Sequence, residues 1–345
     1  MRIAQICPPW LAVPPKGYGG IEWVVSLLAD GLADAGHDVT LFAAGDSKTT
    51  AHLESIFPEA PGSAQINDIM LDATHTMFAL RNAAARFDVL HVHSPFSALA
   101  AAAETAIPAV HTLHGAFSPE MSRLYAQIAD RVWFVAISES QRRMNDSLRY
   151  AGVVHNGIDV ARYPFSVDKE DYLLFLGRAA PEKGWLRAVE TARLTGRRLI
   201  SAVKIAHPTE HEEWETRIKP ILPEGSEVLG ELSHEDKAQL LSRARAVLFP
   251  IDWDEPFGLV MTESMACGTP VIASARGSVP EVIADGETGW IVDVDRYPEE
   301  AAERLELLDT IDAAACRDRV WQLFSKEAMV AGYERVFAEV VASRA

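Results

Sequence analysis

The chain has 345 residues, 48% of them hydrophobic and 23% charged, which is typical of a soluble globular protein with room for two domains. Its formal net charge of −17 repels nucleic acid and anionic lipid, so neither is expected as a partner. The three cysteines, Cys7, Cys267 and Cys316, form no C-x-x-C pair, which argues against a disulfide framework or a structural zinc site.

The N-terminal segment MRIAQICPPW has only a short apolar run before two prolines, too short for a signal peptide. The most apolar long stretch, FSALAAAAETAIPAV, contains Glu104 and Pro108 and is too short to span a bilayer. These features predict a cytoplasmic protein without stable membrane association.

The first half of the chain alternates between strand and helix patterns. A buried strand is predicted at RIAQIC, a turn-rich loop at PPWLAVPPKGYGG, a helix at IEWVVSLLADGLADAG and a second strand at HDVTLFAA. Three more strands are predicted at FDVLHVHSP, IPAVHTLHG and VWFVAISES, each ending in a polar or glycine-bearing loop. This alternation indicates a doubly wound parallel sheet.

A linker pattern at HNGIDVARYPFSVDKED separates this region from a second α/β region. Its strands are predicted at YLLFLGR, RLISAVKI, SEVLGEL, ARAVLFPI, TPVIAS and TGWIV. The sequence therefore predicts an N-terminal Rossmann-like domain over 1–155, a C-terminal one over 156–325, and an amphipathic helix over 326–345. Two such sheets facing each other form a cleft at the carboxyl ends of their strands, where ligands of this fold class bind.

The segment DWDEPFGLVMTESMACG follows a predicted strand and predicts a turn and then a helix. The amides of Phe257, Gly258 and Leu259 are expected at the helix N-terminus, where free donors and partial positive charge favour phosphate. Glu255 before the helix and Glu263 two turns inside it would flank that phosphate and accept hydrogen bonds from hydroxyls. This arrangement fits a sugar–diphosphate–ribose ligand. The alternative is that Glu255 caps the helix and Glu263 is solvated.

Two further segments carry candidate donors to phosphate. In FLGRAAPEKGW, Arg178 and Lys183 follow a strand and are expected to neutralise a diphosphate; alternatively, Lys183 pairs with Glu182 or another neighbour. In PPKGYGGIEW, Gly19 and Gly20 precede a helix and would let its backbone approach a phosphate or sugar closely, although glycine pairs also form simple turns.

Taken together, these segments resemble the retaining nucleotide-sugar glycosyltransferases of family 4, which have the GT-B fold. The resemblance is carried by YGGIE, VHNGID, GRAAPEKG, EPFGLVMTESMACGTPVIAS and GSVPEVIADGETGWIV and spans nearly the whole chain. It implies that Glu255 contacts the donor sugar, Glu263 the ribose, and Arg178 with Lys183 the diphosphate. It also implies that Leu232, in GELSHEDK, lies near the base and that the last helix crosses back onto the N-terminal domain.

The histidines of the N-terminal half offer two kinds of site. His114 ends the strand of HTLHG, and similar enzymes keep a histidine here beside the donor sugar, whereas His111 is expected to face another way. The pair His91 and His93 share one side of a strand and suit a metal, but no third ligand is suggested nearby.

Two further segments bear on metal and base contacts, namely DWD and the region of Lys204 and His207. The D-x-D of DWD holds a metal-bound diphosphate in other glycosyltransferases, but here Arg178, Lys183 and the helix end already supply the neutralising charge, so no metal is expected. The family often has a glycine-rich turn where this chain has Lys204 and His207. Lys204 is therefore a candidate donor-side contact, and the details of the base and ribose pocket stay open.

The predicted reaction is transfer of a sugar from a nucleoside diphosphate, UDP by resemblance, to a hydroxyl group of a small-molecule or oligosaccharide acceptor, with retained configuration and no cofactor. A front-face route is favoured; double displacement needs a nucleophile from the N-terminal domain. Arginine outnumbers lysine 24 to 8, which suggests a bacterial source and a bacterial oligosaccharide or natural-product pathway. The alternatives are a nucleotide-sugar epimerase and a non-catalytic nucleotide-sugar-binding protein. An oxidoreductase is disfavoured because no G-x-G-x-x-G follows the first strand.

Overall fold

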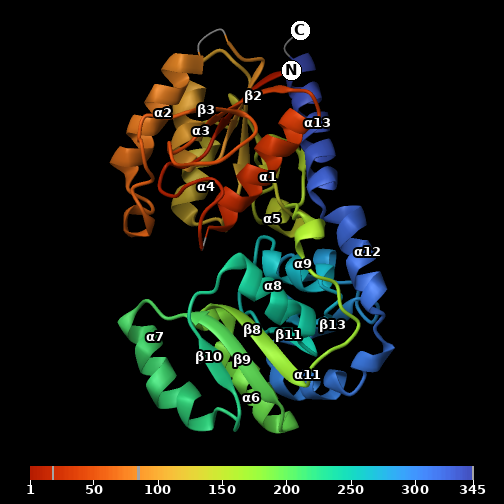
Figure 1. The fold of residues 1–345 in the computed structure, drawn as a ribbon. Coiled ribbons are helices and arrows are strands. Elements are labelled where there is room, and N and C mark those ends of the chain that lie inside the picture. Colours follow the sequence, from red (N-terminus) through yellow and green to blue (C-terminus); the bar gives the residue numbers. More distant parts are fainter. Residues whose placement is uncertain (18, 84–85, 344–345) are drawn as a thin grey trace. The chain divides into compact units, whose positions relative to one another are not determined.

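The computed structural model of the chain describes residues 1–17, 19–83 and 86–343 (Figure 1). It divides into two compact units: unit 1 comprises Met1–Gly157 with Lys326–Ala345, and unit 2 comprises Ile158–Ser325. The sequence predicts the first boundary after residue 155, which is two residues before the boundary in the structure, and the second boundary after residue 325. Along the described ranges, no helix combines the length and apolar character needed to cross a bilayer.

Unit 1 is built on a seven-stranded parallel sheet of order β3-β2-β1-β4-β5-β6-β7. Its strands are β1 (Arg2–Ile6), β2 (Asp38–Phe42), β3 (His52–Glu54), β4 (Val89–Val92), β5 (Ala109–Leu113), β6 (Val132–Ala136) and β7 (Tyr150–Val153). The strand order reverses between β1 and β4. In doubly wound sheets, ligands bind outside the carboxyl ends of the strands at such a switch point.

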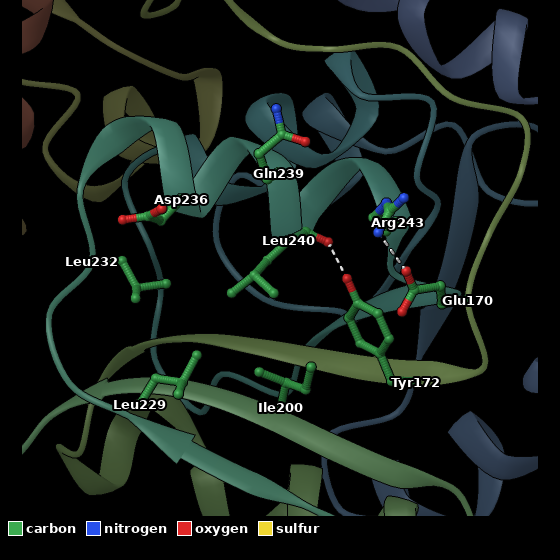
Figure 2. A pocket seen from close by; sticks show the side chains of 9 residues that line it. All are labelled: Glu170, Tyr172, Ile200, Leu229, Leu232, Asp236, Gln239, Leu240 and Arg243. Atoms are coloured by element: carbon green, nitrogen blue, oxygen red, sulfur yellow. Dashed lines mark hydrogen bonds and ion pairs between the residues drawn. The ribbon is translucent and has the colours of Figure 1, made fainter.

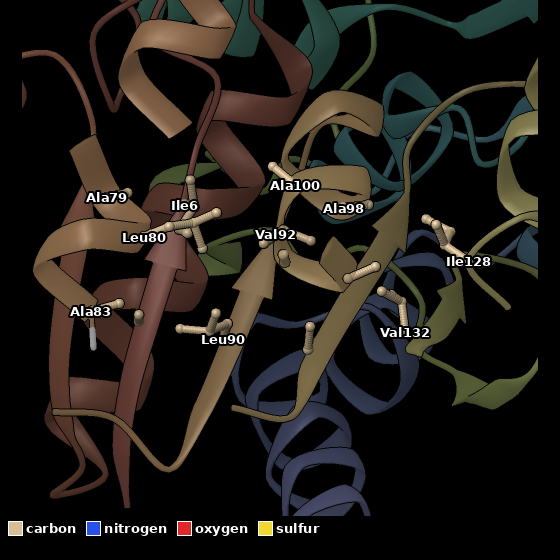
Figure 3. Close-up of a cluster of buried hydrophobic side chains, with 14 of the residues drawn as sticks. Ile6, Ala79, Leu80, Ala83, Leu90, Val92, Ala98, Ala100, Ile128 and Val132 are labelled. Carbon is tan, nitrogen blue, oxygen red and sulfur yellow. The ribbon is translucent and has the colours of Figure 1, made fainter. Parts of the chain in front are cut away.

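Six α-helices accompany this sheet within the described part of unit 1: α1 (Gly20–Asp34), α2 (Ile69–Ala83), α3 (Pro95–Glu104), α4 (Pro119–Ala126), α5 (Glu139–Met144) and α13 (Lys326–Ala342). Alanines of α2 and α3 pack with Ile6, Leu90 and Val92 in one buried cluster (Figure 3). Helix α3 begins after Ser94, whose hydroxyl accepts from the Ser97 amide, with a proline at its first position.

The C-terminal helix α13 belongs to unit 1, although 168 residues of unit 2 separate it from the rest of that unit. The hydroxyl groups of Tyr333 and of Thr112 on β5 lie 2.8 Å apart, and the Thr112 hydroxyl also bonds His91 Nε2 at 2.7 Å. The Tyr333 and Phe337 rings contact His91, and α13 runs beside α1 (Figure 1). The expected return of the last helix to the N-terminal domain is confirmed.

Unit 2 is built on a six-stranded parallel sheet of order β10-β9-β8-β11-β12-β13, which reverses between β8 and β11. Its strands are β8 (Tyr172–Arg178), β9 (Arg198–Lys204), β10 (Glu227–Leu229), β11 (Ala246–Phe249), β12 (Val271–Ser274) and β13 (Gly289–Val292). Its helices are α6 (Trp185–Thr195), α7 (Pro208–Glu213), α8 (His234–Arg243), α9 (Leu259–Ala266), α10 (Val279–Val282), α11 (Tyr297–Leu305) and α12 (Ala313–Leu323). Stacked rings of Phe175, Trp185 and Trp214 anchor its core.

The predicted strands are confirmed in both units, and each sheet is parallel and doubly wound. Two short strands, β3 and β7, were not predicted. One detail of the central motif was wrong: α9 begins at Leu259, so Glu263 is its fifth residue and lies little more than one turn inside it, not two.

Candidate active site

The turn before α9 presents backbone amides as the sequence predicted. Gly258, with φ of 77°, is the N-cap residue of α9 and offers no side chain to cap the amides of the first turn, which begins with Leu259. Phe257 is buried, and its carbonyl accepts a hydrogen bond from Ser278 Oγ at 2.7 Å. The N-cap residue therefore provides no side-chain cap for the first amides of α9.

A second segment fixes the shape of this turn from behind. Gly277 has φ of 53°, and a Cβ at this position would lie 2.4 Å from both the amide nitrogen and the carbonyl oxygen of Glu255. The Ser278 amide also donates to the Glu255 carbonyl at 3.0 Å. The backbone at Glu255 is thus in close contact with Gly277, a position that only glycine can occupy without strain.

Lys183 forms its ion pair with Glu255. Its Nζ lies 2.5 Å from Glu255 Oε2, and the two side chains are only 20% and 14% exposed. Lys183 Nζ also lies 4.6 Å from the centre of the Trp253 ring. Gly184 makes this approach possible, since with φ of 74° its Cα packs so closely on the Pro250 carbonyl that a Cβ there would lie 1.9 Å from the oxygen. The alternative that Lys183 pairs with Glu182 is not observed.

Two further cations lie at the carboxyl ends of β8 and β9. Arg178 and Lys204 are directly opposite each other in the parallel ladder. Arg178 Nη2 lies 3.1 Å from Glu182 Oε1, and Lys204 Nζ lies 3.4 Å from Glu231 Oε2. These cations are 42% and 40% exposed, and ion pairs of this kind contribute little stability. Both ion pairs are therefore weak contributors to the stability of unit 2.

Glu263 is buried and bound by two donors. Tyr163 donates its hydroxyl to Glu263 Oε1 at 2.9 Å, and Lys237 Nζ lies 2.6 Å from the same oxygen. The Glu263 side chain is 8% exposed, so the alternative that it is solvated is not observed. Burial, together with the charge of Glu263, raises the pKa of Tyr163 well above its ordinary value, which keeps the phenol a donor. Both donors thus bond the same oxygen of the carboxylate, Oε1.

A pocket of about 420 Å³ lies between α8 and strands β8 to β10 (Figure 2). Leu232 and Asp236 line one end of it, whereas Arg243 and Glu170 form an ion pair at the other (Figure 2). Its other lining residues are Tyr172, Ile200, Leu229, Gln239 and Leu240. Leu232 thus lies in a pocket that combines apolar side chains with polar groups from both α8 and the β8 side, while Lys183 and Glu255 are not among its lining residues.

The carboxylates of the DWD segment have protein partners. Asp252 Oδ2 lies 2.8 Å from Arg187 Nη2, and its Oδ1 lies 3.7 Å from Arg276 Nη2. Asp254 accepts from the Gly277 amide at 3.3 Å. Within residues 1–17, 19–83 and 86–343, no group of three or more histidine, cysteine or carboxylate side chains is arranged to hold a metal ion.

In unit 1, His114 follows β5 and is half-buried. Its Nε2 lies 2.9 Å from His93 Nδ1, and His93 Nε2 lies 2.8 Å from Gln5 Oε1. The amide of the buried Gln141 donates to the carbonyls on either side of His114, those of Leu113 at 3.0 Å and Gly115 at 2.8 Å. The position of His114 is therefore fixed both through its ring and through the backbone on either side.

Burial keeps the histidines on and after β4 and β5 neutral. Burial lowers the pKa of His114 to about 3 and that of His111 to about 4, and it lowers the pKa of His91 and His93 well below the ordinary value. His111 faces away from His114, as predicted, with its Nδ1 on the Val92 carbonyl and its Nε2 on the Tyr125 hydroxyl. The His91 and His93 rings contact each other with centroids 4.1 Å apart.

The glycine pair at the start of α1 is arranged differently from the helix end of α9. Gly19 is the N-cap and Gly20 the first residue of α1, but a Cβ on Gly19 would lie 2.8 Å from Pro15 Cγ and 2.9 Å from Glu22 Oε2. Glu22 is buried, and burial raises the pKa of its carboxyl. Protein atoms thus fill the space over Gly19. Tyr18 of the YGGIE motif lies outside the described residues.

Several polar residues of these sites were not predicted from the sequence. They are Gln5, His93 in its contact with His114, Gln141, Tyr163 and Lys237. Gln5 and His93 share one signal: Gln5 is the penultimate residue of the buried strand β1, and His93 directly follows the buried strand β4. Gln141, Tyr163 and Lys237 carry no such signal, because their partners lie 26 to 100 residues away in the sequence.

Comparison with known proteins places both units in one enzyme class. Residues 18–162 match the family described as Glycosyltransferase Family 4, and residues 162–314 match Glycosyl transferases group 1. The chain is 31% identical over 337 residues to a phosphatidyl-myo-inositol mannosyltransferase of Mycolicibacterium smegmatis, covering 90% of this chain and 85% of that protein. It is 29% identical over 344 residues to a glycogen synthase of Mycobacterium tuberculosis, covering 84% and 81%.

Solved structures show the same fold over nearly the whole chain. AviGT4, a glycosyltransferase involved in avilamycin A biosynthesis, is 28% identical with a TM-score of 0.77, covering 99% of this chain and 98% of that one. Anabaena Alr3699/HepE, solved in complex with UDP and glucose, is 19% identical with a TM-score of 0.77, covering 99% and 100%. The second likeness bears on the fold alone. With both units matched and two doubly wound parallel sheets in the structure, the chain belongs to the group 1, family 4 glycosyltransferases of the GT-B fold.

Proposed function

We propose that this glycosyltransferase moves a sugar, with retained anomeric configuration and without a metal, from a nucleoside diphosphate to a hydroxyl acceptor. UDP is the favoured nucleotide, and a bacterial oligosaccharide or natural-product pathway is the favoured context. The observation that carries the proposal is the Lys183–Glu255 pair beside the uncapped N-terminus of α9. It joins a cation and a helix end, both suited to a diphosphate, to a carboxylate suited to sugar hydroxyls.

The leaving diphosphate is stabilised electrostatically in this proposal. The bond from the anomeric carbon to the phosphate oxygen breaks, and its electron pair stays on the diphosphate, where Lys183, Arg178 and the amides of Gly258 and Leu259 offset the charge. The acceptor oxygen bonds the same face of the anomeric carbon, and its proton passes to the leaving phosphate oxygen. This front-face route needs no enzyme nucleophile.

Double displacement would require a carboxylate from unit 1. Glu22 and Asp72 are buried carboxylates there, and burial raises the pKa of each. Asp72 accepts from Thr76 and Ser94 hydroxyls, and Glu22 lies at the N-terminus of its own helix. Neither arrangement is that of an exposed nucleophile, which supports the front-face route.

The nucleoside end is assigned to α8 and α9. Glu263, with Oε1 held by Tyr163 and Lys237, is proposed to accept from the ribose hydroxyls through Oε2. Asp236, the neighbour of Lys237 on α8, lines the pocket that contains Leu232, so the ribose carboxylate and the pocket are linked by one helix turn. We assign the base to this pocket and Lys204 to an additional donor contact.

In unit 1, His114 is assigned to the donor sugar. Gly19 and Gly20 remain candidates for a backbone contact, although the crowding by Pro15 and Glu22 leaves Gly20 the better placed of the two. The acceptor is left as a class, because the named relatives include both a glycogen synthase and a phosphatidyl-myo-inositol mannosyltransferase.

The test is a donor panel of UDP-glucose, ADP-glucose and GDP-mannose in the presence of a chelator, with sugar and polyol acceptors. We expect release of the nucleoside diphosphate and an α-linked product from an α-linked donor, resolved by proton NMR. Isomerised donor without transfer would indicate an epimerase, and binding without turnover a binding protein. Glu255→Gln should abolish most turnover, whereas Glu215→Gln, an exposed change in the same unit, should leave it unchanged.

A further inference from the structure

Two buried polar side chains and the half-buried His114 form a hydrogen-bonded chain. Gln5 on β1, His93 after β4 and His114 after β5 lie on three adjacent strands, at the point where the strand order of unit 1 reverses. We propose that Gln5 and His93 are positioning residues that hold His114 with its hydrogen on Nε2 and its lone pair on Nδ1 facing the donor sugar. This inference rests on the proposed role of His114.

The direction of the chain follows from what each atom can do. Gln5 Oε1 only accepts, so His93 Nε2, at 2.8 Å, carries the hydrogen. A neutral imidazole with a hydrogen on Nε2 has a lone pair on Nδ1, so His93 Nδ1 accepts from His114 Nε2 at 2.9 Å. His114 Nδ1 is then an acceptor.

The hydrogen-bond direction requires that the imidazoles of His93 and His114 are both neutral. Their surroundings favour the neutral form. His93 is 3% exposed, and the titratable groups around the pair are the imidazoles of His91 and His111. Burial and these neighbours lower the pKa of both His93 and His114. Neutral His114 offers a hydrogen-bond acceptor rather than a positive charge.

Packing alone does not account for Gln5. Its side chain is fully buried, and its Nε2 has no hydrogen-bond partner among the described residues. A buried amide hydrogen without a partner costs stability, and a leucine of similar size would avoid that cost. We therefore assign the role of the Gln5 amide to its oxygen, Oε1, which orients the His93 ring.

The lone pair on His114 Nδ1 also predicts which kind of sugar group it contacts. An acceptor at Nδ1 takes a hydrogen bond from a sugar hydroxyl, whereas the carboxylate of a uronic acid has no hydrogen to donate at neutral pH. We therefore expect a hydroxyl group of the donor sugar, and not a carboxylate, to face His114 Nδ1.

The first test reads the tautomers directly in the full-length protein by ¹⁵N NMR of the histidine rings, with His114 assigned through His114→Gln. We expect the hydrogen of His114 on Nε2 in the unmodified protein. Gln5→Leu removes the acceptor for His93 and should redistribute the hydrogen on both rings. It should also lower kcat with a neutral donor roughly tenfold, the loss expected for one misdirected hydrogen bond, while leaving Kd for UDP unchanged.

Gln5→Glu is the rescue variant. It keeps the acceptor oxygen, so the tautomer of His114 and the kcat at pH 8 should recover relative to Gln5→Leu. Its charge favours the imidazolium form of His93 and His114, so the pKa of the pair should rise and the acidic loss of kcat should move to higher pH. A pH profile identical to that of the unmodified protein would contradict the contact.

The control is His111→Gln, which alters another buried histidine, whose ring bonds the Val92 carbonyl and the Tyr125 hydroxyl. It should lower stability but leave kcat unchanged in the folded protein. The proposal is overturned if Gln5→Leu leaves the His114 tautomer unchanged, or if His111→Gln lowers kcat equally. If no donor supports transfer, the proposed function fails, whereas the ¹⁵N measurement still decides the hydrogen-bond chain. If Gln5→Leu does not fold, the pH profile and tautomer of Gln5→Glu decide it.

Discussion

Lys183 Nζ lies 2.5 Å from Glu255 Oε2, so the cation assigned to the diphosphate and the carboxylate assigned to the sugar are bonded to each other. The contact joins the loop after β8 to the turn after β11, across the switch point of unit 2. Removing either partner leaves the other as a largely buried charge without compensation. Variants at the two positions must therefore be compared through both binding and turnover.

Lys183 and Arg178 should contribute to binding of the phosphate groups and not of the nucleoside. Lys183→Ala should weaken UDP binding by roughly 1.5–3 kcal/mol, the range for hydrogen bonds to charged groups, and Arg178→Ala should have a smaller effect because its side chain is 42% exposed. Uridine affinity should hardly change for either variant. Calorimetry with UDP and uridine measures this, with Lys219→Ala on the exposed surface of unit 2 as control. Equal losses for both ligands would show that these cations do not touch the phosphates.

Substitution of Glu255 should affect mainly turnover, whereas substitution of Glu263 should affect mainly nucleotide affinity. Glu255→Gln removes negative charge beside a carbon that becomes cationic during transfer, so kcat should fall strongly while UDP affinity is nearly kept. Glu263→Gln should weaken UDP binding by about 1–3 kcal/mol, with a smaller effect on kcat at saturation. Calorimetry and steady-state kinetics on both variants test this difference. Equal loss of nucleotide affinity in the two variants would refute the assignment.

Transfer should not depend on a divalent metal. Asp252 forms ion pairs with Arg187 and Arg276, and we assign the neutralising charge for the diphosphate to Lys183 and Arg178. We expect the initial rate to be unchanged in excess EDTA. Complete loss of activity that manganese restores would instead assign Asp252 and Asp254 to a metal site.

Stability should fall on mild acidification. The folded pKa of His111 is about 4 against an ordinary value of 6.5, and His91 and His93 are shifted in the same direction. Because the unfolded chain binds more protons, the stability gained from neutral imidazoles is present above pH 6.5 and is lost as the pH falls. Each fully buried histidine contributes about 1.4 kcal/mol per pH unit in that window. Guanidinium unfolding at pH 7.5 and 5.5 should show a marked loss, shallower in His111→Gln; equal midpoints at both pH values would contradict it.

The protein should not bind anionic membranes. Its net charge of −17 opposes adsorption to phosphatidylserine or phosphatidylinositol vesicles, and an interfacial anchor requires a basic amphipathic helix. Sedimentation with vesicles that contain phosphatidylserine or phosphatidylinositol tests this. Robust cosedimentation would favour a lipid-linked acceptor, as in the mannosyltransferase relatives.

The sequence predicts the sheets well because their central strands are short, continuous apolar runs, and it predicts Lys183 and Glu255 because both follow such strands. It does not predict β3, which has three residues and a polar pattern, or β7, whose Gly152 weakens the strand signal. The contacts of Glu263 with Tyr163 and of His93 with Gln5 link residues 100 and 88 positions apart. Such contacts follow from strand order, which local periodicity does not encode.

The return of α13 makes unit 2 an insertion within unit 1 in the covalent sense. The two ends of the insertion meet, because the Ile158 amide donates to the Phe324 carbonyl at 2.9 Å and Ile158 pairs with Ser325 as a parallel bridge. A fragment that ends at Gly157 would lack Tyr333 and Phe337 and would leave His91 and Thr112 uncovered. Unit 2 can therefore be exchanged between relatives only through two joints, at 157/158 and 325/326, and a single cut in the chain releases neither unit.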